Sequence, residues 1–425
     1  MKCKICNAQL GKGVTVCPKC GMNNKCVWKR VLAIVCGMLV LAILVCAALY
    51  GFGILDFGLR ENNAQYKDSY TVSDKKALNK SDVIVAKVGD KVLTNGDLQI
   101  YYSVEAVEFI TNYADYLSYL NLNYKEPLHK QYFSESEGVT WQQYFLDSAL
   151  NTWHLYTIMN LAAKDEGYEF GDDLKESIKD LPASVEELAK KNKFESAQQM
   201  VQSDFGGSST AEAYVRYLEN HYTGIAFLGS KYDVMKPTQQ EIEAYFAENQ
   251  KELEANGIKK TSGKYVDVRH ILIQPQGGTE DNKGNVTYSQ AEWDACYTSA
   301  KAILDEWLAG EATEDSFAKL ANKHSEDPGS NTKGGLYTQV ASGKMVDEFD
   351  EWIFEEGRVK GDYGLIKTEF GYHIMYFVNI EDIWISEVRN MILSERADVY
   401  IKEVQKQYPI EVTYKNIVLG NVALG

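Results

Sequence analysis

An uncharged segment near the N-terminus places the strongest constraint on how this chain can fold. Residues 31–55 contain no charged side chain, and residues 31–50 read VLAIVCGMLVLAILVCAALY. Twenty helical residues span about 30 Å, which is the thickness of the hydrocarbon core of a bilayer. The sequence therefore predicts a single transmembrane helix over residues 28–55.

The charges at the two ends of this segment predict its orientation. Lys29 and Arg30 precede it, whereas Asp56, Arg60 and Glu61 follow it. Basic residues stay preferentially on the cytoplasmic side of a membrane helix. We therefore expect a single-pass protein of the cell membrane, with a cytoplasmic N-terminus and with the bulk of the chain extracytoplasmic.

Two other interpretations of this segment are a cleaved signal peptide and a lipoprotein anchored at Cys46. A cleaved peptide would need a basic region of about 30 residues with patterned cysteines, which is far longer than usual. The residue before Cys46 is Val45, where a lipoprotein signal normally has a small residue. An uncleaved anchor is the better interpretation, and the polar residues 56–82 then form a linker to the outer part.

Four cysteines before the predicted membrane helix form two CxxC pairs. They are Cys3, Cys6, Cys17 and Cys20, and ten residues separate the pairs. Thiolates at this spacing can close a tetrahedral metal site, so we predict a zinc ribbon over residues 1–27. The zinc would be structural, because four protein ligands leave no open position, and the ribbon would need it to fold. Iron in the same site and four unliganded thiols are the alternatives.

Charge is distributed unevenly along the chain. Residues 1–30 hold seven basic and no acidic side chains, and the other 395 residues carry a net charge of −23. A large acidic part repels a phosphate backbone, so we expect no nucleic-acid partner. Only Cys296 lies after residue 50, and a secreted disulfide scaffold would spread its cysteines through the folded part.

Residues 83–262 are predicted to be mainly α-helical. Helix starts are indicated at Thr94, Ser209 and Thr238, each followed three residues later by an acidic side chain. Residues 141–164 place large apolar and small side chains four apart on one face, as a packed helix requires.

The C-terminal residues 381–425 are predicted to form a long helix and a short strand. They would complete the helical domain, so that the central segment is an insertion within it. Tyrosines are frequent in residues 66–168. Such side chains suit a surface that grips unfolded apolar segments, and ordinary helix packing with wet hydroxyls is the alternative.

The central residues 263–380 have a different pattern. Residues 266–274 and 371–378 are predicted strands, whose alternation puts His270 and His373 on apolar faces. Two helices, a glycine-containing loop and a third helix lie between them. The order β-α-α-loop-α-β indicates a small α+β unit.

Four blocks of this segment resemble the parvulin family of peptidyl-prolyl isomerases. They are VRHILI, SEDPGS followed by GG, MVDEFDEWIF and KTEFGYHIMYFV, in the order and at the separations of that family. The succession of anchor, helical domain, inserted unit and returning helix is similar to extracytoplasmic foldases of the PrsA and SurA type. The resemblance implies a mainly α chaperone-like domain with an inserted parvulin α+β domain.

The resemblance also implies an activity and its partners. It implies a membrane-anchored peptidyl-prolyl isomerase that assists the folding of exported proteins, with no cofactor for catalysis and with unfolded chains containing X-Pro bonds as substrates. Isomerisation breaks no bond, so a catalyst holds the proline ring, excludes water and favours the twisted amide over a barrier of about 18–20 kcal/mol.

Site residues follow from the same resemblance. It implies catalytic roles for His270, Asp327 and His373 and substrate-binding roles for Tyr337, Met345 and Phe349. We expect the two histidines to face one another and to organise the site rather than to transfer protons. A histidine on an apolar face is often a core residue, and Met345 and Phe349 alone would indicate core packing.

One departure from the family pattern indicates an alternative with reduced or absent isomerase activity. Residues 334–338 read GGLYT where the family usually has GGDLG. One alternative is therefore a catalytically weak or inactive parvulin that acts as a binding-only chaperone. A separate alternative, which does not depend on this departure, is a transmembrane sensor that signals through the zinc ribbon. The sensor predicts a cytoplasmic partner of the ribbon, and a homodimer is a further possibility.

Overall fold

The computed structural model describes residues 73–280 and 286–422. The predicted zinc ribbon with its four cysteines, the predicted transmembrane helix and most of the predicted linker lie outside these residues. Within the described ranges, no helix combines the length and the apolar character needed to cross a bilayer.

The chain divides into two compact units. The helical unit comprises, of the described residues, 73–236 and 393–422, and the inserted unit comprises 237–392. The inserted unit thus interrupts the helical unit in sequence. Its boundaries lie outside the predicted 263–380, because α8 (Gln239–Ala255) packs against the beginning of α12 (Ile383–Gln407) through a buried apolar cluster.

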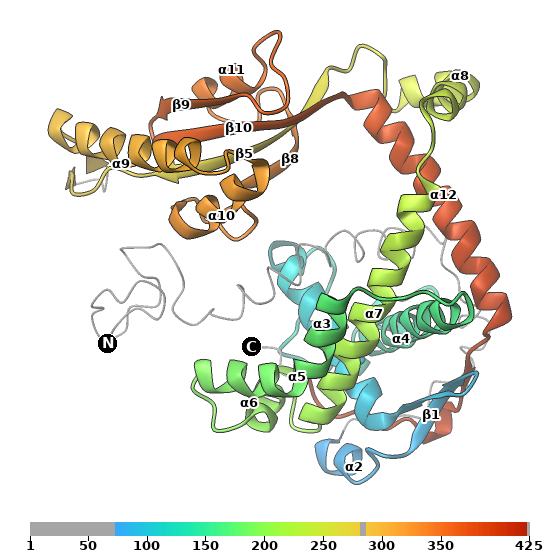
Figure 1. Ribbon diagram of the computed structural model, residues 1–425. Helices are drawn as coiled ribbons and strands as arrows, with labels where there is room; N and C mark the ends of the chain where they lie inside the picture. The colour runs from blue at the N-terminus through green and yellow to red at the C-terminus, as the bar shows by residue number, and fades with distance from the viewer. Residues whose placement is uncertain (1–72, 281–285, 423–425) are drawn as a thin grey trace. The chain divides into compact units, whose positions relative to one another are not determined.

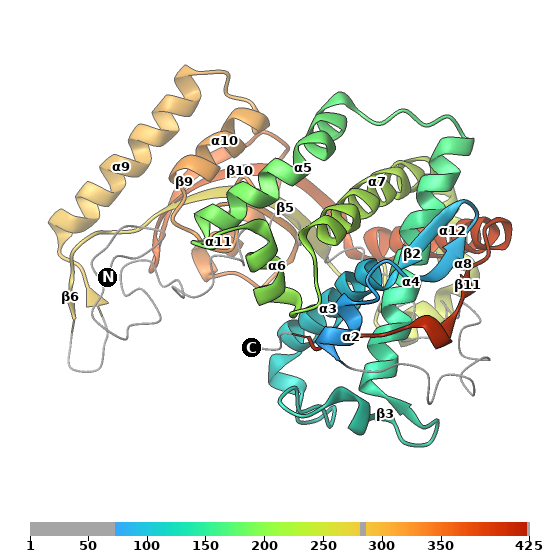
Figure 2. The same ribbon diagram turned by 90° about the horizontal axis from the view of Figure 1, so that it is seen from below.

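Long helices make the framework of the helical unit (Figures 1 and 2). Three of them pack against one another, namely α3 (Asn95–Asn112), α4 (Trp141–Asp165) and α7 (Ala211–Met235). A fourth long helix, α5 (Asp172–Lys191), packs against α7. Shorter helices accompany these four, namely α2 (Asp74–Leu78), α6 (Ala197–Phe205), η2 (Ala114–Tyr116) and η3 (Leu128–Lys130). The prediction that this region is mainly helical is confirmed.

A small antiparallel sheet joins the two ends of the helical unit. Its strand order is β11-β1-β2, with β1 (Ile84–Val88), β2 (Lys91–Thr94) and β11 (Glu411–Val412). Ala86 lies opposite Val412 across β1 and β11. The short 3-10 helix η4 (Tyr414–Asn416) follows β11, and the separate hairpin of β3 (Tyr132–Ser134) and β4 (Val139–Thr140) lies before α4.

The predicted helix starts agree with the structure at two of three positions. Thr94 and Thr238 form reciprocal capping boxes with the acidic residue three positions later. The prediction at Ser209 is wrong by one residue, because Thr210 is the N-cap of α7 and accepts the backbone N–H of Ala213. Two hydroxyl residues in succession offer the same capping chemistry, so the sequence does not separate them.

The end of the predicted linker 56–82 is structured, which corrects that boundary. Ser73 caps α2, and the Asp74 carboxylate accepts hydrogen bonds from the backbone and the side chain of Asn421, at 2.7 and 3.0 Å. The helix is held by the distant C-terminal segment. A polar composition alone reads as linker because it does not reveal such partners.

The inserted unit is built on an antiparallel sheet of order β8-β5-β10-β9. Its strands are β5 (Lys264–Ile273), β8 (Leu336–Ala341), β9 (Tyr363–Thr368) and β10 (Gly371–Asp382). The predicted central strands β5 and β10 are adjacent, with Met375 opposite His270 and His373 opposite Leu272. The prediction missed β8 and β9, which are edge strands and lack the regular alternation of the central pair.

Helices cover both faces of this sheet (Figure 1). On one face, α9 (Gln290–Ala309) and α10 (Glu314–His324) pack with Ile271 and Ile374 of the central strands. On the other, Phe349 and Ile353 of α11 (Asp347–Ile353) pack with neighbours that include Val268. A two-stranded hairpin of β6 (Thr279–Glu280) and β7 (Val286–Thr287) lies between β5 and α9. The two predicted histidines lie on the face that α11 covers.

Candidate active site

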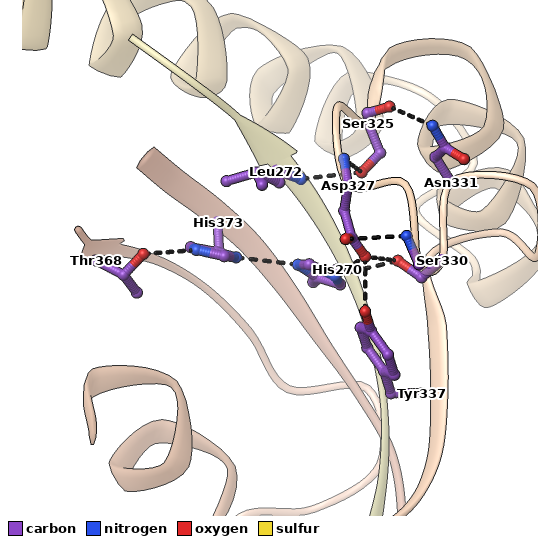
Figure 3. Close-up of polar contacts among 10 residues, drawn as sticks. His270, Leu272, Ser325, Asp327, Ser330, Asn331, Tyr337, Thr368 and His373 are labelled. Atoms are coloured by element: carbon purple, nitrogen blue, oxygen red, sulfur yellow. Dashed lines mark hydrogen bonds and ion pairs between the residues drawn. The ribbon is translucent and has the colours of Figure 1, made fainter. Parts of the chain in front are cut away.

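Two buried imidazoles lie side by side on the central strands β5 and β10 (Figure 3). The Nδ1 atoms of His270 and His373 are 3.0 Å apart, and the rings are nearly parallel, with centroids 5.2 Å apart and an interplanar angle of 19°. Alternation along each strand places both side chains on the same sheet face, diagonally across the pair of strands. The expectation that they face one another agrees with this geometry.

Asp327 lies beside the outer edge of His270 in the loop that follows α10. The Nε2 atom of His270 is 3.0 Å from Oδ2 of Asp327. Ser330 and Tyr337 donate their hydroxyl protons to the same oxygen, and the backbone N–H of Gly329 donates to Oδ1 at 3.1 Å. The carboxylate is therefore fixed on all sides by donors of the inserted unit.

Backbone contacts hold this loop against β5. The Ser325 hydroxyl accepts the backbone N–H of Leu272 at 3.1 Å and that of Asp327 at 3.4 Å. The side-chain amide of Asn331 donates to the carbonyl of Ser325 at 3.3 Å (Figure 3). The position of Asp327 relative to His270 is thus set by the strand itself.

Thr368 continues the network on the other side of the imidazole pair. Its Oγ1 atom lies 2.8 Å from Nε2 of His373 and accepts the backbone N–H of Phe370 at 3.1 Å. Hydrogen bonds therefore run without a break from Thr368 through both imidazoles to Asp327.

The charge of Asp327 fixes the direction of these hydrogen bonds when both imidazoles are neutral. An ionised carboxylate only accepts, so Nε2 of His270 carries the proton that faces Asp327. The bare Nδ1 of His270 then accepts the Nδ1–H of His373. The bare Nε2 of His373 in turn accepts the Thr368 hydroxyl proton, and the Phe370 N–H supplies the donor that Thr368 needs.

The pKa shifts support this assignment. Burial, and then the neighbouring His270, lower the pKa of His373 to about 3, so this imidazole is neutral at ordinary pH. Partial burial opposes ionisation of Asp327, but hydrogen bonds from His270 and Ser330 outweigh it and hold the pKa of this carboxyl well below its usual range. Burial and the charge of Asp327 raise the pKa of Tyr337 to about 12. These three groups are therefore suited to shape polarity and not to exchange protons near pH 7.

An apolar wall meets the imidazole pair. The ring of Phe349 stands edge-on to both imidazoles, 5.3 Å from His270 at 83° and 5.6 Å from His373 at 85°. Phe349 is only 3% exposed, and the partly buried Met345 and Tyr337 pack in the same cluster. The two imidazoles thus form a polar surface, and Phe349 forms an apolar surface directly beside it.

All six site residues predicted for this segment come together, while Cys3, Cys6, Cys17 and Cys20 lie outside the described residues. Among the residues that are described, no group of three or more His, Cys, Asp or Glu side chains is placed to hold a metal ion.

Two members of the network were missed by the sequence reasoning. Ser330 follows Asp327 by three residues, and Thr368 precedes the turn into β10. Hydroxyl residues at such positions are common in turns, so their composition carried no separate signal. The spacing Asp-x-x-Ser in the block SEDPGS is the one hint that was present.

The GGLYT segment keeps the backbone geometry that the site needs. Gly335 has a φ of +71°, and an added Cβ would lie 2.1 Å from the carbonyl oxygen of His270. The Gly335 carbonyl accepts the backbone N–H of His270 at 2.8 Å. The two following residues begin β8, which carries the Tyr337 hydroxyl to Asp327.

Comparison with protein families identifies the central part of the chain. Residues 253–381 match the family model of the PPIC-type PPIASE domain. This part is therefore a parvulin-type peptidyl-prolyl isomerase domain, in agreement with the resemblance.

Curated relatives are similar to part of this chain. The Foldase protein PrsA of Exiguobacterium sibiricum is 34% identical over 121 residues, which are 28% of this chain and 36% of that protein. The Chaperone SurA of Saccharophagus degradans is 27% identical over 192 residues, covering 42% of this chain and 40% of that protein. The chain thus spans well under two thirds of the length of these relatives.

Solved structures of similar proteins include the crystal structure of PrsA from Bacillus subtilis. It is 18% identical in sequence, with a TM-score of 0.31, over 63% of this chain and 88% of that chain. PrsA from Bacillus anthracis is 16% identical, with a TM-score of 0.21, over 59% of this chain and 92% of that chain.

Proposed function

We propose that the inserted unit catalyses cis–trans isomerisation of X-Pro bonds and that the whole chain is a foldase for exported proteins. The observation that carries this proposal is the edge-on contact of Phe349 with both paired imidazoles. It sets an apolar surface for a proline ring directly against a fixed polar face. The match of residues 253–381 to an isomerase domain supports the same activity.

The chemistry required of such a site is modest and conformational. The trans form of an X-Pro bond is favoured by only about 0.5–1 kcal/mol, but exchange takes tens of seconds or longer. Phe349 and Met345 would hold the proline ring and exclude water, which raises the relative stability of the less polar, twisted amide. Each ~1.4 kcal/mol gained in that state accelerates exchange tenfold.

The hydrogen-bonded network would keep the polar face rigid during the reaction. Asp327 holds His270 in one tautomer, and Thr368 completes the chain at His373. A preorganised arrangement of this kind needs no rearrangement as the amide twists. No proton has to leave or join the protein, in agreement with the lowered pKa of His373.

Refolding of a protein whose slow phase is limited by proline isomerisation tests this proposal. The unchanged full chain should accelerate the slow phase, and His270→Ala and Phe349→Ala should each lower kcat/KM by at least about tenfold. Tyr363→Phe is a matched control, since it removes an exposed hydroxyl on β9. Equal acceleration by the two alanine variants and the unchanged chain would remove the isomerase proposal.

A binding-only chaperone is the second candidate, and an exposed aromatic segment favours it. The residues between α3 and α4 expose large rings, of which Tyr116 is 61% and Tyr119 is 83% accessible. Such rings can contact unfolded apolar segments. Under this candidate, Tyr116→Ser/Tyr119→Ser would weaken suppression of client aggregation, whereas Phe349→Ala would not. The opposite pattern would exclude it.

Membrane anchoring and the zinc ribbon are part of the proposal on sequence grounds. The uncharged residues 31–55 support an anchor with the foldase outside, and the paired CxxC motifs support a structural zinc site on the cytoplasmic side. Protease added to intact cells should digest the outer part and spare the ribbon. Cys3→Ser/Cys6→Ser should lose bound zinc by elemental analysis, and pull-down with and without chelator tests a cytoplasmic partner.

A further inference from the structure

We propose that Tyr337 is a positioning residue of the site, whose hydroxyl locks the Asp327 carboxylate against His270 and thereby fixes the direction of the hydrogen bonds through both imidazoles. This inference rests on the proposed isomerase function. It gives Tyr337 a role beyond the substrate-binding role that the family resemblance implies.

The position of Tyr337 follows from the edge strand that carries it. It is the second residue of β8 and lies opposite Val268 on β5. Its ring is 5.4 Å from the His270 ring at an angle of 33°, and it packs in the apolar cluster that contains Phe349. Its hydroxyl oxygen reaches Oδ2 of Asp327 at 3.0 Å (Figure 3). One side chain therefore belongs to the apolar and to the polar half of the site.

The turn beneath the hydroxyl is shaped to receive it. A Cβ atom at Gly329 would lie 2.4 Å from the Tyr337 hydroxyl oxygen, so a larger residue there would displace the tyrosine. Gly329 also donates its backbone N–H to the other carboxylate oxygen of Asp327. The same glycine thus admits the tyrosine and orients the group to which the tyrosine is bonded.

The hydroxyl completes the set of donors around one oxygen. Within the described structure, Oδ2 of Asp327 lies within hydrogen-bond distance of His270, Ser330 and Tyr337. Bonds to an ionised acceptor are stronger than neutral ones and favour the charged form. Because the three donors converge, the carboxylate cannot rotate away from His270 without losing the others.

The departure of GGLYT from GGDLG acquires a physical meaning from this contact. Tyr337 stands where the family pattern has a leucine, and a leucine offers no donor to a carboxylate. The tyrosine keeps an apolar ring in the cluster around Phe349 and adds a hydroxyl that faces Asp327. The segment that favoured a weak parvulin in the sequence therefore supplies a contact that stabilises the network.

Titration of Asp327 tests the proposal without any measurement of activity. The full chain would carry 13C-labelled aspartate, with the Asp327 carboxyl signal assigned by its loss in Asp327→Asn. In Tyr337→Phe, which keeps the ring, protonation of Asp327 should begin at a clearly higher pH, reflecting a proton affinity about tenfold greater. Tyr363→Phe should leave it unchanged. Identical titration of Asp327 in the unchanged chain and in Tyr337→Phe would overturn the proposal.

Kinetics then separates a role of Tyr337 in positioning Asp327 from a role in contacting the proline ring of the substrate. Tyr337→Phe should lower kcat about tenfold, leave KM unchanged, and move the acidic limb of the pH–rate profile upward. Tyr337→Leu, the residue of the family pattern, should show the same loss of kcat. A normal kcat with a raised KM in both variants would show that Tyr337 only contacts the proline ring of the substrate. If the folded, unchanged chain isomerises no X-Pro bond, the proposed function fails, while the titration still decides the role of Tyr337.

Discussion

The helical unit and the inserted unit both enclose carboxylates, but they treat them in opposite ways. In the inserted unit, converging donors hold Asp327 ionised, with its pKa well below the usual range despite partial burial. In the helical unit, burial raises the pKa of Glu105 although Thr152 and Ser148 donate to it at 2.6 and 2.7 Å.

A second carboxylate on α3 shows the difference more clearly. Burial, and then the charge of Glu105, raise the pKa of Glu108 to about 8. Burial alone makes a carboxylate prefer its neutral form, and enough aligned donors reverse that preference. The charged state is therefore maintained where the proposed chemistry needs a fixed polarity, and not where helices only pack.

The largest expected effect concerns the backbone that supports the charged site. Gly335→Ala should lower the free energy of unfolding of the inserted unit by about 3 kcal/mol or more, because its Cβ would meet the backbone of the central strand at His270. Gly343→Ala is the matched control, since Gly343 also has a positive φ of +78° but no atom within 4 Å of an added Cβ. It should lose only about 1 kcal/mol. Equal losses of unfolding free energy in the two variants, measured by urea unfolding, would contradict the close approach of Gly335 to the His270 carbonyl.

Removing the charge of the site should have the next largest effect. Asp327→Asn keeps the size of the side chain but replaces the anionic acceptor of His270 with a neutral amide. We expect kcat/KM for X-Pro isomerisation to fall about 100-fold with little change in stability. Asp347→Asn, on the exposed side of α11, is the control and should retain full activity. Activity unchanged in Asp327→Asn would show that the carboxylate is not needed.

Glu108 in the helical unit predicts a stability that falls as the pH rises, because its pKa is raised in the folded state and not lowered like that of Asp327. The pKa of Glu108 is higher in the folded state than in the unfolded state, so the folded protein binds the additional proton. Its contribution is fully present below about pH 4.5 and is lost as the pH rises toward 8, by roughly 2 kcal/mol after allowance for partial exposure. Glu108→Gln should reduce this slope in urea unfolding of the helical unit and leave the part that comes from the raised pKa of Glu105.

Glu137→Gln provides the comparison for this measurement, because Glu137 is exposed in the turn between β3 and β4. It should leave the pH dependence of unfolding as it is in the unchanged chain. A slope that is as steep in Glu108→Gln as in the unchanged chain would place its origin in another group.

A change at Thr368, at the end of the hydrogen-bonded network opposite to Asp327, should give the smallest effect. Thr368→Val keeps the shape of the side chain and removes the hydroxyl that His373 contacts at 2.8 Å. Because Asp327 still orients His270, we expect kcat to fall only about fivefold. A loss of kcat as large as in Asp327→Asn would show that Thr368 and Asp327 are equally important to the network, which would contradict the assignment of its orientation to Asp327.

Much of the inserted unit could be predicted because its central strands obey a simple alternation. His270 and His373 each sit among apolar residues of period two, which fixes their common face once the strands are adjacent. Capping boxes at Thr94 and Thr238 were equally local signals. In such places the neighbouring residues carry the whole physical cause.

The remaining features depend on partners that are distant in the sequence. β8 and β9 are edge strands that take their register from β5 and β10, and their own residues alternate poorly. The hydroxyls of Ser330 and Thr368 become part of the site only after the sheet brings them to Asp327 and His373. No local pattern separates such hydroxyls from those of ordinary turns.

Exchange spectroscopy on a short peptide with one X-Pro bond tests the central claim most directly. The full chain at catalytic concentration should produce exchange between the cis and trans signals, and Phe349→Ala, which removes the ring that contacts both imidazoles, should abolish most of it. Absence of exchange with the folded, unchanged chain, or equal exchange with Phe349→Ala, would contradict the account.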